Sequence, residues 1–171
     1  MASENFHTNV FIVRHGQPEY PRDEQGRKLI YGPDVSLSEV GRMQVRELNG
    51  RLPQIDTVYS SPYPRAVQTA EIIAEKKSPT GIVLVEDLKD IIAQGAVGLP
   101  LDDFNAGKID YKREIGDETS EQLERRVLPA YQTIFNAEKG KTTAIVGHGD
   151  GIRILAYRVV EDKKGPLPDM K

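Results

Sequence analysis

The chain has 171 residues, of which 38% are hydrophobic; this is enough for one ordinary core, so we expect a single domain over 1–171. Its 23 Lys and Arg against 26 Asp and Glu exclude the basic excess of a general nucleic-acid or anionic-membrane binder. The chain has no cysteine, which excludes disulfides and thiolate metal sites. No apolar stretch approaches the roughly 20 residues of a membrane span, and we therefore expect a cytoplasmic protein without a nucleic-acid or membrane partner.

Short apolar runs alternate with segments of helical periodicity, which is typical of an α/β fold with a mostly parallel sheet and crossover helices. The predicted strands are Val10–Val13, Ile55–Tyr59, Ile82–Val85 and Thr142–Val146. The predicted helices begin near Ser38, at about Arg65, after Thr119 and at Ile152, and the last of them ends at Val160.

Local signals support two of these helices. Pro53 ends the helix that begins near Ser38, because proline cannot continue it. Thr119 and Gln122 have the spacing of a capping box, in which each side chain accepts a hydrogen bond from the backbone of the other residue. Pro129 predicts a kink in the helix that follows this box.

The segment 91–118 has weak periodicity, and we expect it to form a short, loop-rich lid that sets specificity. It holds proline and aromatic residues together with basic ones, namely Pro100, Phe104, Tyr111, Lys108, Lys112 and Arg113. We expect the basic side chains to form a solvated face rather than to bind a second anion. The tail 161–171 is charged and rich in proline, which favours a flexible segment.

A histidine-glycine pair follows both the first and the last predicted strand, in the runs Arg14-His15-Gly16 and Gly147-His148-Gly149. A strand that stops at such a pair places an imidazole at the edge of the sheet, where glycine lets the backbone approach a ligand closely. Open α/β sheets bind their ligands at that edge. The repetition therefore predicts a site to which both strand ends contribute.

The tripeptide Arg14-His15-Gly16 suits a phosphoryl group better than a carbonyl. A neutral imidazole can attack an electrophile when a backbone carbonyl holds its other ring nitrogen. The arginine offers a planar fork of donors for phosphate oxygens, and the glycine lets a backbone N–H come near. A core histidine at a strand end beside a surface arginine is the alternative interpretation of these three residues.

The strand-turn-helix pattern of Ser60–Ala70 puts Arg65 near a helix N-terminus, where the guanidinium and the positive helix end can both face an anion. Alternatively, the Ser-Pro pair only starts the helix and Arg65 is solvated. His148 precedes the Gly-rich start of the last helix, and it can stabilise charge that develops on a transferring phosphoryl group.

Four runs carry a family resemblance, in the order Phe11–Gly16, Leu37–Arg42, Ser60–Ala70 and Val146–Gly149. Together they resemble the histidine phosphatase superfamily, in its phosphoglycerate mutase-like branch, over most of the chain. The resemblance implies a three-layer αβα sandwich and a phosphohistidine at His15 that water later hydrolyses. It also implies a phosphate pocket formed by Arg14, Arg65 and His148, to which we add Gly16 and Gly149, and we expect no metal or other cofactor.

The mechanism implied by the family also needs an acid to protonate the leaving oxygen, since an alkoxide is a poor leaving group. In the family this is usually a glutamate after a Leu-x pair, and Leu88-Lys89-Asp90 matches that place with the shorter aspartate. We therefore expect Asp90 to be the acid, the alternative being a solvated charge. Relatives resembling mutases carry Glu after the Arg-His-Gly triplet, whereas this chain has Gln17, which can contact phosphate without charge repulsion or face solvent.

These features predict a metal-independent phosphomonoesterase for a small phosphorylated metabolite, because the short lid argues for hydrolysis over return of the phosphoryl group. The alternatives are a phosphoglycerate-type mutase, a protein phosphohistidine phosphatase, and a phosphate-binding module with little turnover. A zinc site is disfavoured, since the three histidines lack His-x-x-x-His spacing and His7 is expected at the surface. We expect Glu118 and Arg126 to serve helix capping and surface pairing, and nothing in the sequence sets the oligomeric state.

Overall fold

The computed structural model describes residues 7–75, 81–92, 94–108 and 118–160. Within them, one sheet contains the strands β1 (Asn9–Arg14), β2 (Thr57–Ser60), β3 (Ile82–Leu84) and β4 (Thr142–Gly147). Their order across the sheet is β1-β4-β2-β3, and every neighbouring pair is parallel. All the predicted strands are confirmed, with small shifts at their ends.

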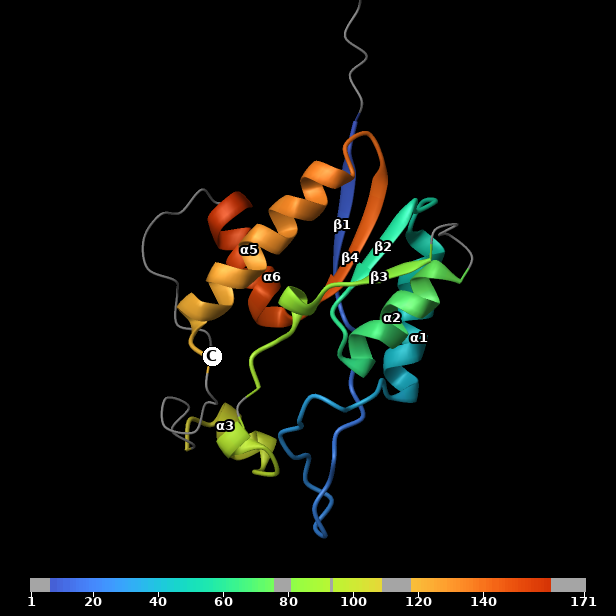
Figure 1. Cartoon of the computed structure of the whole chain (residues 1–171). Helices are drawn as coiled ribbons and strands as arrows, with labels where there is room; N and C mark the ends of the chain where they lie inside the picture. Colours follow the sequence, from blue (N-terminus) through green and yellow to red (C-terminus); the bar gives the residue numbers. More distant parts are fainter. Residues whose placement is uncertain (1–6, 76–80, 93, 109–117, 161–171) are drawn as a thin grey trace, which may run out of the picture.

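Helices cover both faces of the sheet, which gives the predicted three-layer sandwich (Figure 1). One face carries α1 (Glu39–Arg51) and α2 (Pro64–Ala74), and the other carries α5 (Ser120–Ala137) and α6 (Gly149–Leu155). The short α3 (Leu101–Asn105) lies beyond the carboxyl ends of the strands, at the bottom of Figure 1. Turns of 3-10 helix at Glu86–Leu88 and Gln94–Ala96 precede it.

The expected capping signals are found at the starts of two helices. Ser38 caps α1, and its Oγ accepts a hydrogen bond from Gly41 N at 3.0 Å. Thr119 and Gln122 form the capping box of α5, with bonds of 2.7 and 3.2 Å. Pro129 lies inside α5, which is continuous to Ala137.

The last helix begins earlier than the sequence suggests. Its first residue is Gly149 rather than Ile152, because the extended backbone of His148 serves as the cap and its carbonyl already accepts a hydrogen bond from Ile152 N at 3.1 Å. Its continuation, Ala156–Val160, is a π-helical turn. The histidine is therefore fixed at a strand-helix junction.

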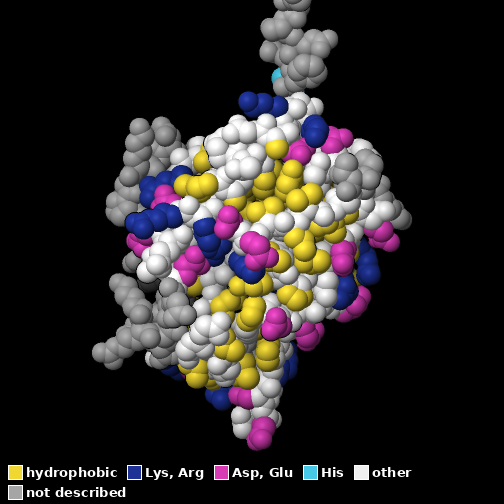
Figure 2. Space-filling view, in the orientation of Figure 1, with side chains coloured by type: hydrophobic (Ala, Val, Ile, Leu, Met, Phe, Trp, Pro, Cys, Tyr) yellow, Lys and Arg dark blue, Asp and Glu magenta, His cyan; other side chains and the backbone are white. Residues whose placement is uncertain are grey.

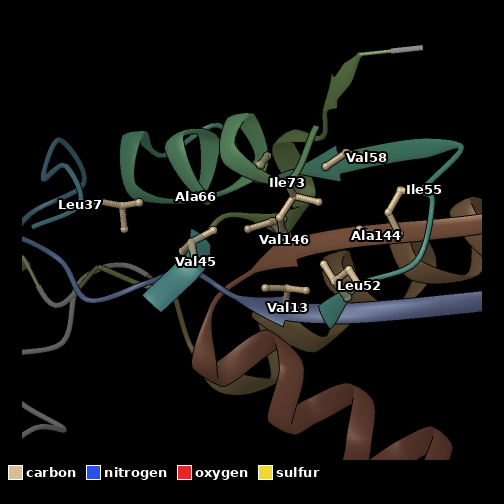
Figure 3. Close-up of a cluster of buried hydrophobic side chains, with 11 residues drawn as sticks. Val13, Leu37, Val45, Leu52, Ile55, Val58, Ala66, Ile73, Ala144 and Val146 are labelled. Carbon is tan, nitrogen blue, oxygen red and sulfur yellow. The ribbon is translucent and has the colours of Figure 1, made fainter. Parts of the chain in front are cut away.

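Two apolar clusters join the sheet to its helices. The cluster under α1 and α2 includes Val13, Val45, Val58, Ile73 and Val146 (Figure 3). The cluster under α5 and α6 includes Leu88, Leu123, Val127, Tyr131, Ile145 and Ile154. Because each cluster draws on the strands and on both helices of its layer, the carboxyl edge of the sheet is held from both sides.

The surface carries charges of both signs. Figure 2 shows Lys and Arg side chains interspersed with Asp and Glu side chains on one face of the molecule. His7 is exposed, as expected. None of the helices in the described ranges is long and apolar enough to cross a membrane.

The loop after β1 passes very close to α1 at two glycines. A Cβ on Gly16 would lie 2.6 Å from Gly41 O, and a Cβ on Gly41 would lie 2.1 Å from Gln17 O. Both distances are too short for any side chain, so this approach requires glycine on each side. Ser38 N also donates to Gln17 O at 2.9 Å. These contacts fix the loop that carries His15 against the start of α1.

We predict that Gly41→Ala lowers the free energy of unfolding by about 1–3 kcal/mol, because the added methyl group forces α1 and the loop apart. Gly50→Ala is the matched control in the same helix, since a Cβ there meets nothing within 4 Å. Alanine is favoured over glycine in a helix by roughly 0.5–1 kcal/mol, so this control should gain stability. Urea unfolding of both variants checks the prediction, and equal stability of the two would contradict it.

Candidate active site

The sheet register brings the two predicted histidines together. Arg14 at the end of β1 pairs with Gly147 at the end of β4, so the residues that follow them, His15 and His148, leave the sheet side by side. Their ring centroids are 5.1 Å apart. Both side chains are buried. Strand pairing thus joins two segments that are far apart in the sequence.

The hydrogen bonds of His15 define its tautomer. Nδ1 lies 2.7 Å from Gly16 O, and because a carbonyl oxygen can only accept, Nδ1 carries the proton. Arg65 Nε donates to His15 Nε2 at 3.3 Å, which requires a lone pair there. Burial lowers the pKa of His15 from 6.5 to about 4, against the opposing effect of the Gly16 carbonyl. His15 is therefore neutral near pH 7, with its lone pair on Nε2.

Arg65, in the first turn of α2, is a buried cation with a side chain that is 1% exposed. Its Cζ lies 5.1 Å from the ring centre of Tyr31 and 5.0 Å from that of Tyr63, and its Nη1 donates to Pro33 O at 3.1 Å. No ion pair within the described ranges involves Arg65. The alternative of a solvated Arg65 is wrong, and a buried guanidinium without a carboxylate suits an anion supplied by a ligand.

His148 and Asp90 present unsatisfied polar atoms close to one another. His148 Nε2 lies 2.8 Å from Ser61 Oγ, while its Nδ1 lies 3.8 Å from Asp90 Oδ2. Both His148 Nδ1 and Asp90 Oδ1 are buried without a hydrogen-bond partner in the part of the chain that is described. Burial lowers the pKa of His148 well below 6.5, so it is neutral and forms no true ion pair with Asp90. Such orphaned atoms are what the oxygens of a ligand would satisfy.

Asp90 follows the 3-10 turn Glu86–Leu88, and its side chain is 21% exposed. Burial, and then the charge of Asp150, raise the pKa of Asp90 to about 7, although Arg65 acts in the opposite direction. A substantial fraction of this carboxyl group is therefore protonated at neutral pH. That is the state in which a carboxyl group can act as a general acid.

A cavity of about 330 Å³ extends from these groups, and Arg14, Arg65 and Asp90 line it. The Arg14 guanidinium lies over Gly149, where a Cβ would be 3.6 Å from Arg14 Cζ. The rest of the wall is mostly apolar or aromatic and consists of Tyr20, Ile30, Tyr31, Ile91, Ile92, Leu101, Phe104 and Asn105. A phosphoryl group held by the arginines would thus face a largely uncharged wall.

Parts of the expected lid form this wall. Ile30 N donates to Leu99 O and Leu101 N donates to Lys28 O, each at 2.9 Å, so the segment before α3 is bonded to the loop after β1. Lys108 pairs with Asp103 at 2.9 Å and is largely exposed, in line with a solvated face. The expectations for Tyr111, Lys112, Arg113 and the tail 161–171 lie outside the described residues.

Gly16 and Gln17 use backbone groups to hold the loop. Gly16 N donates to Thr69 Oγ1 at 3.2 Å, and Gln17 N donates to Gln44 Oε1 at 3.1 Å. Thr69 Oγ1 in turn donates to Arg65 O at 2.8 Å. The phosphate contacts predicted for Gly16 and Gln17 stay predictions.

Sequence reasoning missed several residues that support the site. Ser61 and Thr69 lie within the run Ser60–Ala70, and their positions carry a signal: Ser61 directly follows β2, and Thr69 is one helical turn after Arg65. Tyr31 lies in an irregular loop, where no periodicity marks it. Its position beside Arg65 depends on tertiary contacts alone.

Comparison with known proteins agrees with this geometry. Residues 10–170 match the histidine phosphatase superfamily, branch 1. The chain belongs to this superfamily. It is 30% identical over 166 residues to phosphoglycerate mutase-like protein 4 of Arabidopsis thaliana. The matched region covers 89% of this chain and 71% of that protein.

Two further relatives fit the same family. A metal-independent phosphoserine phosphatase of Arabidopsis thaliana is 28% identical over 169 residues, covering 90% of this chain and 69% of that protein. Bacillus stearothermophilus YhfR has a solved structure with a TM-score of 0.74 and 25% identity, covering 94% of this chain and 82% of that one. This histidine phosphatase thus has the expected phosphoglycerate mutase-like fold, and as an enzyme it is a phosphatase.

We predict that Asp90→Asn stabilises the fold at about pH 8 but not at about pH 3.5. The pKa of Asp90 is about 7 in the folded protein, whereas its ordinary value, which applies to the unfolded chain, is 3.8. The folded protein therefore favours the protonated form of Asp90. The stability that this protonation contributes is fully present below pH 3.8 and is lost as the pH rises through 7. Above pH 7 the variant escapes the penalty for the buried charge, on the order of a few kcal/mol.

Urea unfolding at both pH values checks this expectation, with Asp87→Asn as the control because Asp87 is exposed on the same turn. A gain in stability that is equal at both pH values would contradict the raised pKa of Asp90.

Proposed function

We propose that this histidine phosphatase is a metal-independent phosphomonoesterase that acts on a small phosphorylated metabolite through a phosphohistidine at His15. The observation that carries the proposal is the buried Arg65, which forms no ion pair with a carboxylate of the described residues and donates to the lone pair of a neutral His15. An anion site therefore lies within hydrogen-bond distance of a nucleophile. A phosphoryl group supplies both the anion and the electrophile.

In the first step, His15 Nε2 attacks phosphorus in line with the ester oxygen, so that an N–P bond forms as the P–O bond breaks. Arg65 Nε exchanges its bond to His15 for one to a phosphoryl oxygen, and Arg14 donates to another. When Ser61 donates to His148 Nε2, the proton of His148 is on Nδ1, where it can donate to a third oxygen. The Gly16 carbonyl stabilises the charge that develops on His15.

Asp90 completes both half-reactions. Its carboxyl group gives its proton to the leaving oxygen, which departs as an alcohol. The resulting carboxylate then takes a proton from the water that attacks phosphorus, and the N–P bond breaks to release inorganic phosphate. His15 and Asp90 return to their starting states, so protons and electron pairs balance over the cycle.

Two observations support a monoester with one phosphoryl group. The cavity wall beyond the arginines is largely apolar, and Lys108 forms an ion pair with Asp103. Neither feature provides a free cation for a second phosphoryl group. The relative named a metal-independent phosphoserine phosphatase fits hydrolysis of such a compound. The raised pKa of Asp90 favours turnover over a phosphate-binding module, since binding alone needs no general acid.

We predict that His15→Ala lowers hydrolysis of phosphomonoesters by at least about 10³-fold and abolishes the phosphoenzyme, because the nucleophile is removed. EDTA should leave the activity of the wild type unchanged. Within the described residues, no three or more His, Cys, Asp or Glu gather as metal ligands would. Turnover of a substrate panel with EDTA and mass spectrometry of the base-quenched enzyme check these outcomes.

His7→Ala is the control, since His7 is exposed and lies before β1. Unchanged activity of His15→Ala would disprove the phosphohistidine mechanism. If the wild type binds phosphate but turns over no substrate, the chain is a phosphate-binding module instead.

We also predict that kcat/KM follows a bell-shaped curve with limbs near pH 4 and pH 7. Activity is lost below the lower limb because His15 becomes protonated, and above the upper limb because Asp90 loses its proton. Asp90→Asn should remove the upper limb and lower kcat/KM on an alkyl phosphate by about 10²–10⁴-fold. The loss on p-nitrophenyl phosphate should be much smaller, because its phenolate leaves without a proton. A persisting upper limb in the variant would assign the acid to another group.

A further inference from the structure

Arg126 of α5 reaches across to the segment that carries Asp90. Its Nη1 donates to Asp87 O and to Lys89 O, at 2.8 Å each. Its Nε and Nη2 donate to the two carboxylate oxygens of Glu118, at 2.5 and 2.6 Å. One planar guanidinium thus holds two backbone carbonyls and a carboxylate at the same time.

The expected pairing of Arg126 with Glu118 is present, but the expected helix capping is not. Thr119, not Glu118, caps α5. The side chains of Arg126 and Glu118 are only 23% and 28% exposed. Both residues line an open cavity of about 390 Å³ that Asp90 also lines. The pair therefore belongs to the surroundings of the site.

Lys89 O is the carbonyl oxygen of the peptide bond that joins Lys89 to Asp90. The hydrogen bond from Arg126 to this oxygen therefore holds the backbone directly before Asp90. Leu88, which is 2% exposed, anchors the same turn in the core beneath α5. On the other side of Asp90, its own carbonyl accepts a hydrogen bond from Tyr63 Oη at 3.4 Å. The backbone is thus held on both sides of the carboxyl group.

An aspartate depends strongly on such support. Its side chain is one methylene shorter than glutamate, so the position of its carboxyl group follows the position of its backbone closely. A small displacement of the peptide between residues 89 and 90 would move Asp90 Oδ2 away from His148 Nδ1, which is 3.8 Å distant. Misplacement of a reacting group by about 1 Å can lower a rate by as much as 10²-fold.

We propose that Arg126, itself oriented by Glu118, is the residue that positions the general acid Asp90, by fixing the peptide between Lys89 and Asp90. This inference rests on the proposed function and extends it to a residue outside the phosphate pocket. Arg126 acts through the backbone and contributes no atom to the reaction. A lysine could not replace it, because a single ammonium group lacks the planar fork that reaches both carbonyls and both carboxylate oxygens.

The test compares Arg126→Met with Arg125→Met on two substrates. Arg125 precedes Arg126 on the same helix and is exposed, so the control removes the same charge without touching the turn. We expect Arg126→Met to lower kcat/KM on an alkyl phosphate by about 10–100-fold, since kcat/KM reports the steps up to departure of the leaving group. On p-nitrophenyl phosphate kcat/KM should change little, because its phenolate leaves without a proton, and inhibition by inorganic phosphate should be unchanged. Arg125→Met should behave as the wild type on both.

Two further measurements separate positioning from general damage. In an Asp90→Asn background, Arg126→Met should lower kcat/KM on the alkyl phosphate no further, because the group that it positions is already absent. Arg126→Lys and Glu118→Gln should show smaller losses with the same dependence on the leaving group. If Arg126→Met does not fold, these two variants still allow the same comparison of leaving groups.

Equal losses on both substrates, an undiminished loss in the Asp90→Asn background, or no loss at all would overturn the role of Arg126. None of these results would affect the phosphohistidine, which depends on His15→Ala. Conversely, an active His15→Ala protein would overturn the proposed function itself, whatever Arg126 does.

Discussion

The site depends on one constraint, which is that the guanidinium of Arg65 is buried against His15 and forms no ion pair with a carboxylate of the described residues. Two aromatic rings and the Pro33 carbonyl hold the cation in place, and its Nε reaches the imidazole. Its charge adds to the burial that lowers the pKa of both histidines. The folded protein thus keeps a buried cation beside a histidine that stays neutral. The strands, the glycine contact with α1 and the first turn of α2 all serve to maintain this juxtaposition.

Burial gives the two sides of the site opposite pKa shifts from a single physical cause. It lowers the pKa of His15 and raises that of Asp90, since a desolvated site disfavours an imidazolium and a carboxylate alike. Near neutral pH the proposed nucleophile His15 is therefore free of its proton, while a substantial fraction of the proposed acid Asp90 retains one. The same burial leaves Asp90 Oδ1 and His148 Nδ1 without hydrogen-bond partners among the described residues, an arrangement that active sites commonly keep at the expense of stability.

The sequence predicts the strands, the helix starts and the central residues of the site because these have local signals. Apolar runs mark β1 and β4, the capping box marks α5, and the ends of parallel strands must meet at one edge, which brings His15 and His148 together. What could not be predicted depends on contacts between distant segments. Nothing local shows that Tyr31 packs beside Arg65, or that Arg126 reaches the turn before Asp90. The same holds for the approach of Gly16 to Gly41.

The strand order has a consequence for the growing chain. β4 lies between β1 and β2, yet it is the last of the described strands to be synthesised. While Thr142–Gly147 is still within the ribosome, β1 and β2 have no strand to join them, and each leaves an unpaired edge open to wrong partners. His148 comes immediately after that strand, so insertion of β4 closes the sheet and delivers the second histidine in one event. A chain in which β4 has not yet paired therefore lacks the juxtaposition of His15 and His148 on which the candidate site depends.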